Sequence, residues 1–295
     1  MTLCDLRPWL DRAQREKFAI GAFNANTLEQ VQAIVIAAQA EQSPAVIQVS
    51  HRALQYLGSG AELLGLEYIA AVGRVAAQSV AVPIALHLDH ATEDEVRRAI
   101  SLGFTSVMFD GSLLPYDQNV QMTRRLADEA RIAGVCMEAE LGEVPKPGVS
   151  EDTGALTDPD EAAAFVARNR DRFAGDCARL NARCRRQARL HRSRTPEGDR
   201  AAVSLPLVLH GSSSVLDGQI AEGIRLGLCK VNVATQLNKV FTLAARARLE
   251  DDEAIVDRAK IISVRRAGGD RRRARAHPVL RLVRQGGVRD PLRQR

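Results

Sequence analysis

The segment IALHLDHATEDEVRRAISLGFTSVMFD, residues 84–110, predicts a strand, a helix and a second strand. IALHLDH (84–90) follows Pro83, and TSVMFD (105–110) is rich in residues that favour strands. Between them, Thr92 precedes three acidic residues, which suit the positive end of a helix dipole. The segment therefore indicates one βα unit and the strand that begins the next unit.

The same alternation continues in both directions from this segment. Further strands are predicted at 19–23, 45–50, 135–142, 205–211 and 229–235, and helices at about 28–41, 61–78, 117–133, from 160, at 216–226 and up to 250. These elements make seven βα units, and the pattern fails at about 169–200, where the sixth unit of eight would fit.

Eight parallel strands with outer helices form a (β/α)8 TIM barrel. We therefore expect an α/β fold, a single TIM barrel over residues 1–295, in which 169–203 and about 255–295 do not fit and the sixth strand is absent. An open doubly wound sheet is the alternative, but no GxGxxG or Walker loop follows the first strand.

Composition narrows the class of protein. Of the 295 residues, 45% are hydrophobic, yet there is no run of 18 apolar residues and no charged-then-apolar leader, so we expect a soluble cytoplasmic protein. The five cysteines are an odd number without a CxxC pair, which favours reduced thiols over disulfides or a cysteine zinc cluster.

The net charge of +5 is unevenly distributed. Residues 168–200 contribute +7 and residues 258–295 contribute +11, which leaves −13 for the rest of the chain. Both basic segments owe their charge to arginine, and Phe173 is the single Phe, Trp or Tyr in the two of them, so the sequence gives little support to a nucleic-acid-binding function. The chain is an acidic globular protein with two arginine-rich pieces.

Polar side chains stand where the predicted strands end. They are Asn24, Ser50, Asp89 with His90, Asp110, Glu138 or Glu140, His210 with Gly211, and Asn232. In a barrel these ends share one active-site face. Strands that merely exit into polar loops explain part of this pattern, but two histidines with several carboxylates favour a metal site over core or capping roles.

Two further motifs have a chemical meaning. Alternation in HLDH places His87 and Asp89 on one face of the strand, with His90 on the other face or already in the loop. HGSSS (210–214), before a helix, offers backbone N–H groups and hydroxyls to an anion, and the following strand end at Asn232 and Thr235 lies where barrels often bind phosphate.

These segments resemble the class II, metal-dependent ketose-bisphosphate aldolases. The resemblance covers about 20–166 and 205–245, and its most specific part is the order HLDH, EAELG, LVLHG. It implies a zinc-dependent lyase that cleaves fructose 1,6-bisphosphate reversibly to dihydroxyacetone phosphate and glyceraldehyde 3-phosphate, in glycolysis, gluconeogenesis or the Calvin cycle. It also implies a homo-oligomer, a dimer or tetramer, with a sugar bisphosphate as partner and neither nucleic acid nor membrane. The alternatives are a tagatose-1,6-bisphosphate aldolase and a non-catalytic barrel relic.

The resemblance also implies roles for individual residues. Asp89 would be the acid that protonates the aldehyde oxygen during cleavage, and Glu151 would move the proton on carbon 3 of the ketose. Zinc would be bound by His90 and His210, with Asp110 and Glu140 at a secondary metal site. Substrate would be contacted by Asn24, Ser50, Gly211, Ser212, Ser213, Asn232, Val233, Ala234 and Thr235.

The chain departs from the family pattern at three places. The usual Gly-Gly before Glu151 is replaced by residues 145–148, PKPG. Lysines are scarce, as zinc chemistry without a Schiff base allows, and Lys230 is the one lysine placed to suggest a class I mechanism. A third zinc histidine, expected at the end of the sixth strand, is missing, because the surroundings of His191 resemble no strand end.

A displaced reading frame would account for the unmatched segments. With suitable codons, a shift of one base turns residues 169–177 into TGIDSLAI and residues 276–287 into HIRFFGSSGKA, which resemble the family's sixth strand and C-terminus. Our hypothesis is that both arginine-rich segments are out-of-frame translations.

Overall fold

The computed structural model describes residues 3–141, 164, 168, 177–180, 205–257 and 260–261. The elements, in chain order, are α1 (Arg7–Glu16), β1 (Ile20–Asn24), α2 (Leu28–Glu41), β2 (Ala45–Ser50), α3 (His51–Leu57), α4 (Glu62–Gln78), β3 (Ile84–Ala91), α5 (Glu93–Ser101), β4 (Ser106–Phe109), α6 (Tyr116–Ile132), β5 (Cys136–Leu141), β6 (Cys177–Leu180), β7 (Leu207–Leu209), a 3-10 turn (Ser212–Ser214), α9 (Asp217–Leu226), β8 (Leu228–Val233) and α10 (Thr235–Asp251).

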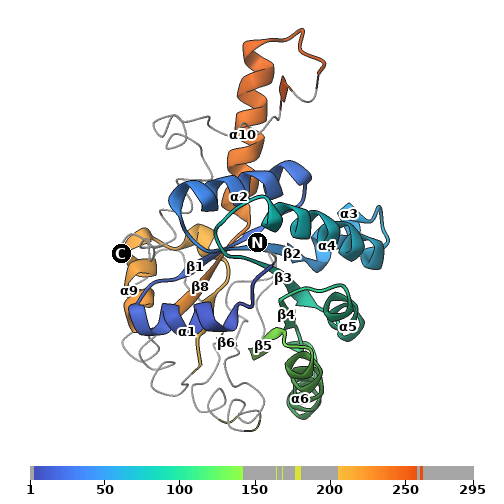
Figure 1. Ribbon diagram of the computed structural model, residues 1–295, viewed down its shortest axis with the longest axis vertical. Helices are drawn as coiled ribbons and strands as arrows, with labels where there is room; N and C mark the ends of the chain where they lie inside the picture. Colours follow the sequence, from blue (N-terminus) through green and yellow to red (C-terminus); the bar gives the residue numbers. More distant parts are fainter. Residues whose placement is uncertain are drawn as a thin grey trace.

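The strands are parallel and hydrogen-bonded in chain order, with β8 paired back to β1. Helices lie outside the strands in Figure 1, so the fold is a parallel α/β arrangement of the TIM-barrel type. The positions of the predicted strands are confirmed, and α2 has the predicted bounds. Helices α1 and α3 were not predicted. The helix expected from residue 160 falls outside the described residues, apart from helical positions 164 and 168.

The expectation that the sixth strand is absent is wrong. β6 pairs with β5 from Glu138↔Cys177 to Leu141↔Leu180, and with β7 through Ala178↔Leu207. A ladder uses backbone N–H and C=O groups, which every residue except proline supplies, so a strand can form without the usual apolar alternation. Residues 169–176 and 181–203 lie outside the described part, as do Glu151 and His191.

The inward faces of the strands change from apolar to polar toward their C-terminal ends. Two residues before a polar side chain, the same face carries a small or apolar one: Ala22 before Asn24, Val46 before Gln48, Ala85 before His87, Cys136 before Glu138, and Val208 before His210. These lower residues form one buried cluster with Leu6 and Leu10, which lie at the start of α1 and within it. Helix α1 therefore closes the bottom of the barrel and provides the apolar floor of a polar site.

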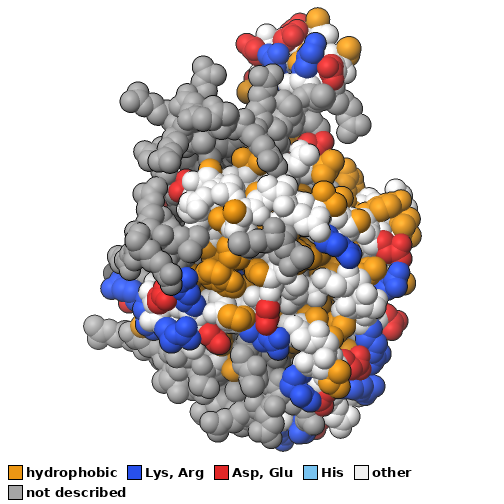
Figure 2. All heavy atoms as spheres, in the orientation of Figure 1, with side chains coloured by type: hydrophobic (Ala, Val, Ile, Leu, Met, Phe, Trp, Pro, Cys, Tyr) orange, Lys and Arg blue, Asp and Glu red, His pale blue; other side chains and the backbone are white. Residues whose placement is uncertain are grey.

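The outward faces pack against the surrounding helices. Ile47, Leu88 and Val107 on the strands share the main hydrophobic core with residues such as Ile34 on α2 and Leu66 on α4. Charged side chains of both signs cover α5 and α6 (Figure 2), where Arg97 pairs with Glu93 and Glu129. Across the residues that the structure describes, no helix combines the length and the apolar composition needed to span a membrane.

Truncation of the floor should destabilise the fold. Leu10 has no exposed surface, so Leu10→Ala removes buried methyl groups and leaves a cavity. The free energy of unfolding should fall by about 2–5 kcal/mol in urea denaturation. Arg15→Ala, at an exposed position of the same helix, should change it by less than about 0.5 kcal/mol. Equal effects of the two substitutions would contradict a sealing role for α1.

Candidate functional site

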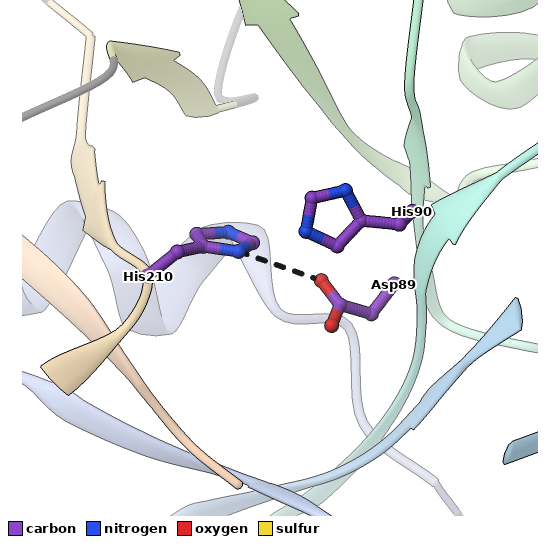
Figure 3. A group of neighbouring side chains, drawn as sticks. All are labelled: Asp89, His90 and His210. Atoms are coloured by element: carbon purple, nitrogen blue, oxygen red, sulfur yellow. Dashed lines mark ion pairs between the residues drawn. The ribbon is translucent and has the colours of Figure 1, made fainter. Parts of the chain in front are cut away.

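The centre of the site is a β-bulge at the end of β3. Leu88 pairs with Val107 of β4, and Ala91 pairs with Phe109. Between these two pairs β3 therefore has one residue more than β4. His90 takes up the extra residue with φ of 53°, in the left-handed region that non-glycine residues rarely adopt. As a result Asp89 and His90, although consecutive, both turn toward the same space (Figure 3). Regular alternation would have placed them on opposite faces.

His210 at the end of β7 faces this pair from across the barrel. Its ring centroid lies 5.2 Å from that of His90, with the rings nearly perpendicular. The Nδ1 atom lies 3.8 Å from Asp89 Oδ1, the contact drawn as a dashed line in Figure 3. One ligand atom each from Asp89, His90 and His210 lie within 4.8 Å of one another. The predicted convergence of these residues is therefore confirmed.

A second group shares His90. The Nδ1 atom of His90 lies 2.7 Å from Asp110 Oδ2 and 3.5 Å from Glu140 Oε2, which brings the predicted secondary site together. Burial alone would raise the pKa of Asp110, but hydrogen bonds from His90 and Ser112 lower it below its usual range. Asp110 is therefore ionised at neutral pH, as a cation ligand should be.

A chain of amides holds the other oxygen of Asp89. Gln48 Nε2 donates to Asn24 Oδ1 at 3.0 Å, and Asn24 Nδ2 donates to Asp89 Oδ2 at 3.3 Å. Burial would raise the pKa of Asp89, but the nearby His210 and His90 lower it. The predicted substrate residue Asn24 is thus also a partner of the predicted acid, which is a carboxylate in its resting state.

A layer of buried charge lies one step deeper in the barrel. The Nζ atom of Lys230 is 2.8 Å from Glu138 Oε2 and 3.3 Å from His87 Nε2, and all three side chains are fully buried. Burial and the charge of Lys230 lower the pKa of His87 to about 3, so this ring is neutral. Burial would raise the pKa of Glu138, but Lys230 and His210 hold it well below its usual value.

The predicted phosphate-binding segments lie at the ends of β7 and β8. Gly211 adopts φ of 65°, and the three serines that follow form a 3-10 turn, so α9 begins only at Asp217. The helix that begins directly at a strand end is α10, which starts at Thr235 without a side-chain cap or an acidic residue in its first turn. Ser212 Oγ donates to the carbonyl of Asn232 at 2.6 Å and ties the two segments together.

An adjoining cavity of about 520 Å³ lies where β1, β2 and α10 meet. Its lining includes Asn24, Ser50 and Ala234, three predicted substrate residues. It also includes Arg52, which sequence reasoning did not identify and whose cationic side chain suits an anionic substrate. The lining residues are Asn24, Asn26, Thr27, Gln30, Ser50, Arg52, Ala53, Tyr56, Ala234, Asn238, Phe241 and Thr242.

The donor atoms fit a divalent cation. The two imidazoles of His90 and His210 suit zinc, with the carboxylate of Asp89 beside them, and two carboxylates with an imidazole suit zinc or a harder cation. Asp89 Oδ1 and Asn232 Oδ1 are buried yet accept no hydrogen bond from the described residues. Buried oxygens normally have partners, so these two are consistent with a ligand at this position.

Comparison with known proteins agrees with the geometry. The profile of a family described as fructose-bisphosphate aldolase class-II matches residues 4–284. A fructose-bisphosphate aldolase of Geobacillus stearothermophilus is 36% identical over 269 residues, 89% of this chain and 91% of that protein. A sulfofructosephosphate aldolase of Alkalicoccus urumqiensis is 34% identical over 249 residues, 82% of this chain and 84% of that protein.

The likeness extends to solved structures. The crystal structure of the YdjI aldolase from Escherichia coli K12 has a TM-score of 0.75 and 28% sequence identity, and the match covers 97% of each chain. The resemblance found in the strand-end motifs is therefore confirmed over nearly the whole length of the protein. The chain belongs to the class-II fructose-bisphosphate aldolase family.

Proposed function

We propose that this lyase is a zinc-dependent fructose-1,6-bisphosphate aldolase built on a complete (β/α)8 barrel. The observation that carries the proposal is the convergence of Asp89, His90 and His210 from two separate strands, with ligand atoms within 4.8 Å. That arrangement combines a metal site with a proton carrier.

His90 and His210 would hold the zinc, and Asp110 with Glu140 would hold a second divalent cation. Bound zinc acts as a Lewis acid that stabilises the negative charge left on the ketone half when the bond between carbons 3 and 4 breaks. A Schiff base is then unnecessary. Lys230, the candidate for one, is fully buried in an ion pair with Glu138.

The lowered pKa of Asp89 changes the role expected from the sequence. Cleavage removes a proton from the hydroxyl on carbon 4, so the ionised carboxylate accepts that proton as the aldehyde leaves. In the synthetic direction the same group returns the proton to the aldehyde oxygen. Asn24 orients the carboxylate for both directions through the contact at Oδ2.

The substrate would lie across the strand ends. The ketose phosphate would meet the backbone of the Gly211–Ser213 turn and the uncapped first turn of α10, where N–H groups point outward. The aldehyde half would lie beside Ser50 in the adjoining cavity. Movement of the carbon-3 proton by Glu151 remains part of the proposal, although that residue lies outside the described part.

Fructose bisphosphate is favoured over tagatose bisphosphate by the names of the relatives described above. A barrel relic is disfavoured because the acid and both histidines are present and correctly grouped. The surface charge of both signs over α5 and α6 gives no support to a nucleic-acid partner. A homo-oligomeric state and a cytoplasmic location remain predictions.

Removal of metal should abolish cleavage. Dialysis against a chelator should eliminate the release of glyceraldehyde 3-phosphate from fructose 1,6-bisphosphate, and Zn²⁺ should restore it. Enzyme treated with borohydride and substrate together should be as active as enzyme treated with borohydride alone, because no imine forms. Inactivation by borohydride only in the presence of substrate would refute the class II assignment.

Substitutions of Asp89 and of His210 should differ in their effect on the zinc content of the protein. Asp89→Ala should lower kcat by about 10² to 10⁴ and retain zinc, because the carboxylate transfers a proton. His210→Ala should lose both activity and zinc, as measured by atomic absorption of the purified variant. Loss of zinc from Asp89→Ala as well would show that Asp89 is mainly a ligand.

The present chain should be a poor aldolase, since no histidine in residues 169–203 has the GTxHG-like surroundings of the third zinc ligand. A gene with its reading frame restored over codons 168–203 should encode a GTxHG-like segment and raise both zinc affinity and kcat. Sequencing of the gene and assays of both purified proteins test this expectation. Full activity in the present chain, from a confirmed gene, would exclude the frame hypothesis.

A further inference from the structure

The ion pair of Glu138 and Lys230 lies directly beneath the proposed metal site. Glu138 on β5 and Lys230 on β8 are both fully buried, with Nζ and Oε2 2.8 Å apart. A buried ion pair is weak support for stability, because removing two charges from water costs nearly as much as their attraction returns. A role in the site is therefore a better explanation for this pair than packing.

The two oxygens of Glu138 serve different partners. Oε2 accepts from Lys230, and Oε1 lies 2.7 Å from Nε2 of His210. An ionised carboxylate only accepts hydrogen bonds, so this contact places the imidazole proton on Nε2. The lone pair is then on Nδ1, the nitrogen that lies 3.8 Å from Asp89 Oδ1 and faces the metal group.

Strand β8 constrains the same ring a second time. Asn232, two residues after Lys230 and on the same face, has its Nδ2 atom 3.0 Å from Nε2 and 3.2 Å from Nδ1 of His210. With the proton on Nε2, this amide can donate only to Nδ1. Lys230 is itself located by His87, whose Nδ1 lies 2.7 Å from Ser106 Oγ. A continuous chain of polar contacts thus runs from β4 through β3, β8 and β5 to the histidine on β7.

We propose that Glu138 is a positioning residue, which fixes the tautomer and orientation of His210 so that Nδ1 is the metal-binding nitrogen. Lys230 holds Glu138 in the orientation that leaves Oε1 for the ring. Carboxylate partners of this kind commonly orient ligand histidines. The proposal rests on the proposed function only in taking His210 as a metal ligand.

The isosteric substitution Glu138→Gln tests the proposal. Next to Lys230 the new amide should turn its oxygen to the ammonium group and its NH2 to His210, which moves the imidazole proton to Nδ1. Affinity of the metal-free protein for Co²⁺ should fall about 10- to 100-fold in competition with a chelating dye. The ¹⁵N shifts of His210 should show the tautomer change without any metal.

The double variant Glu138→Gln/Lys230→Met separates positioning from charge. Without the ammonium group the amide oxygen can turn back to Nε2, so Co²⁺ affinity and the original tautomer should both be largely recovered. Further loss of affinity in the double variant would overturn the proposal, as would a folded Glu138→Gln protein with unchanged affinity and tautomer.

Glu95→Gln is the matched control. Glu95 is a buried carboxylate 2.6 Å from Nδ1 of His51, close to the same end of the barrel but in neither metal group. Its substitution should leave Co²⁺ affinity within about twofold and the His210 shifts unchanged. Since none of these measurements uses a sugar, failure to cleave fructose bisphosphate would count against the proposed function and not against the role of Glu138.

Discussion

At the end of β3 the chain contains one residue more than its partner strand, and His90 accommodates it in a left-handed conformation. The geometry of the site depends on that bulge. Regular alternation would direct either the acid or the histidine inward, whereas the bulge directs both. His90 then reaches two groups of ligands at once, so both candidate metal positions depend on one backbone irregularity. Such a conformation is costly and persists only where the surrounding structure imposes it.

The electrostatics follow from the layers beneath. An apolar floor made by α1 and the lower strand residues keeps water from the bottom of the barrel, so the charges above it interact strongly. The carboxylates at positions 89, 110 and 138 are all held in their ionised forms by neighbouring imidazoles or by Lys230. The site is therefore prepared to receive positive charge before any cation or substrate arrives.

Much of the fold and part of the candidate site could be predicted from the sequence. Period-2 and helical periodicity located seven strands and most of the helices between them within a few residues, but not α1 or α3. The rule that strand ends in a barrel share one face brought Asp89, His90 and His210 together. The bulge could not be predicted, because HLDH contains no glycine to signal a left-handed residue. The sequence drew attention to Lys230 and to Glu138 separately, but it did not indicate that they form an ion pair. Their pairing requires the register between strands that are distant in the chain. β6 was missed since its backbone pairing does not depend on an apolar pattern.

The floor of the barrel has a consequence for how the chain is made. Leu10 is synthesised long before Cys229 on β8, yet the two residues belong to one buried cluster. One edge of β1 likewise has no strand to pair with until β8 has been made. Until β8 has been synthesised, α1 therefore has an apolar face without its final neighbours, and this helix can pack in its final position only when β8 pairs with β1. Contacts between the two ends of a long chain form slowly. Folding of such a chain therefore requires that α1 stay without its final contacts until β8 has been synthesised.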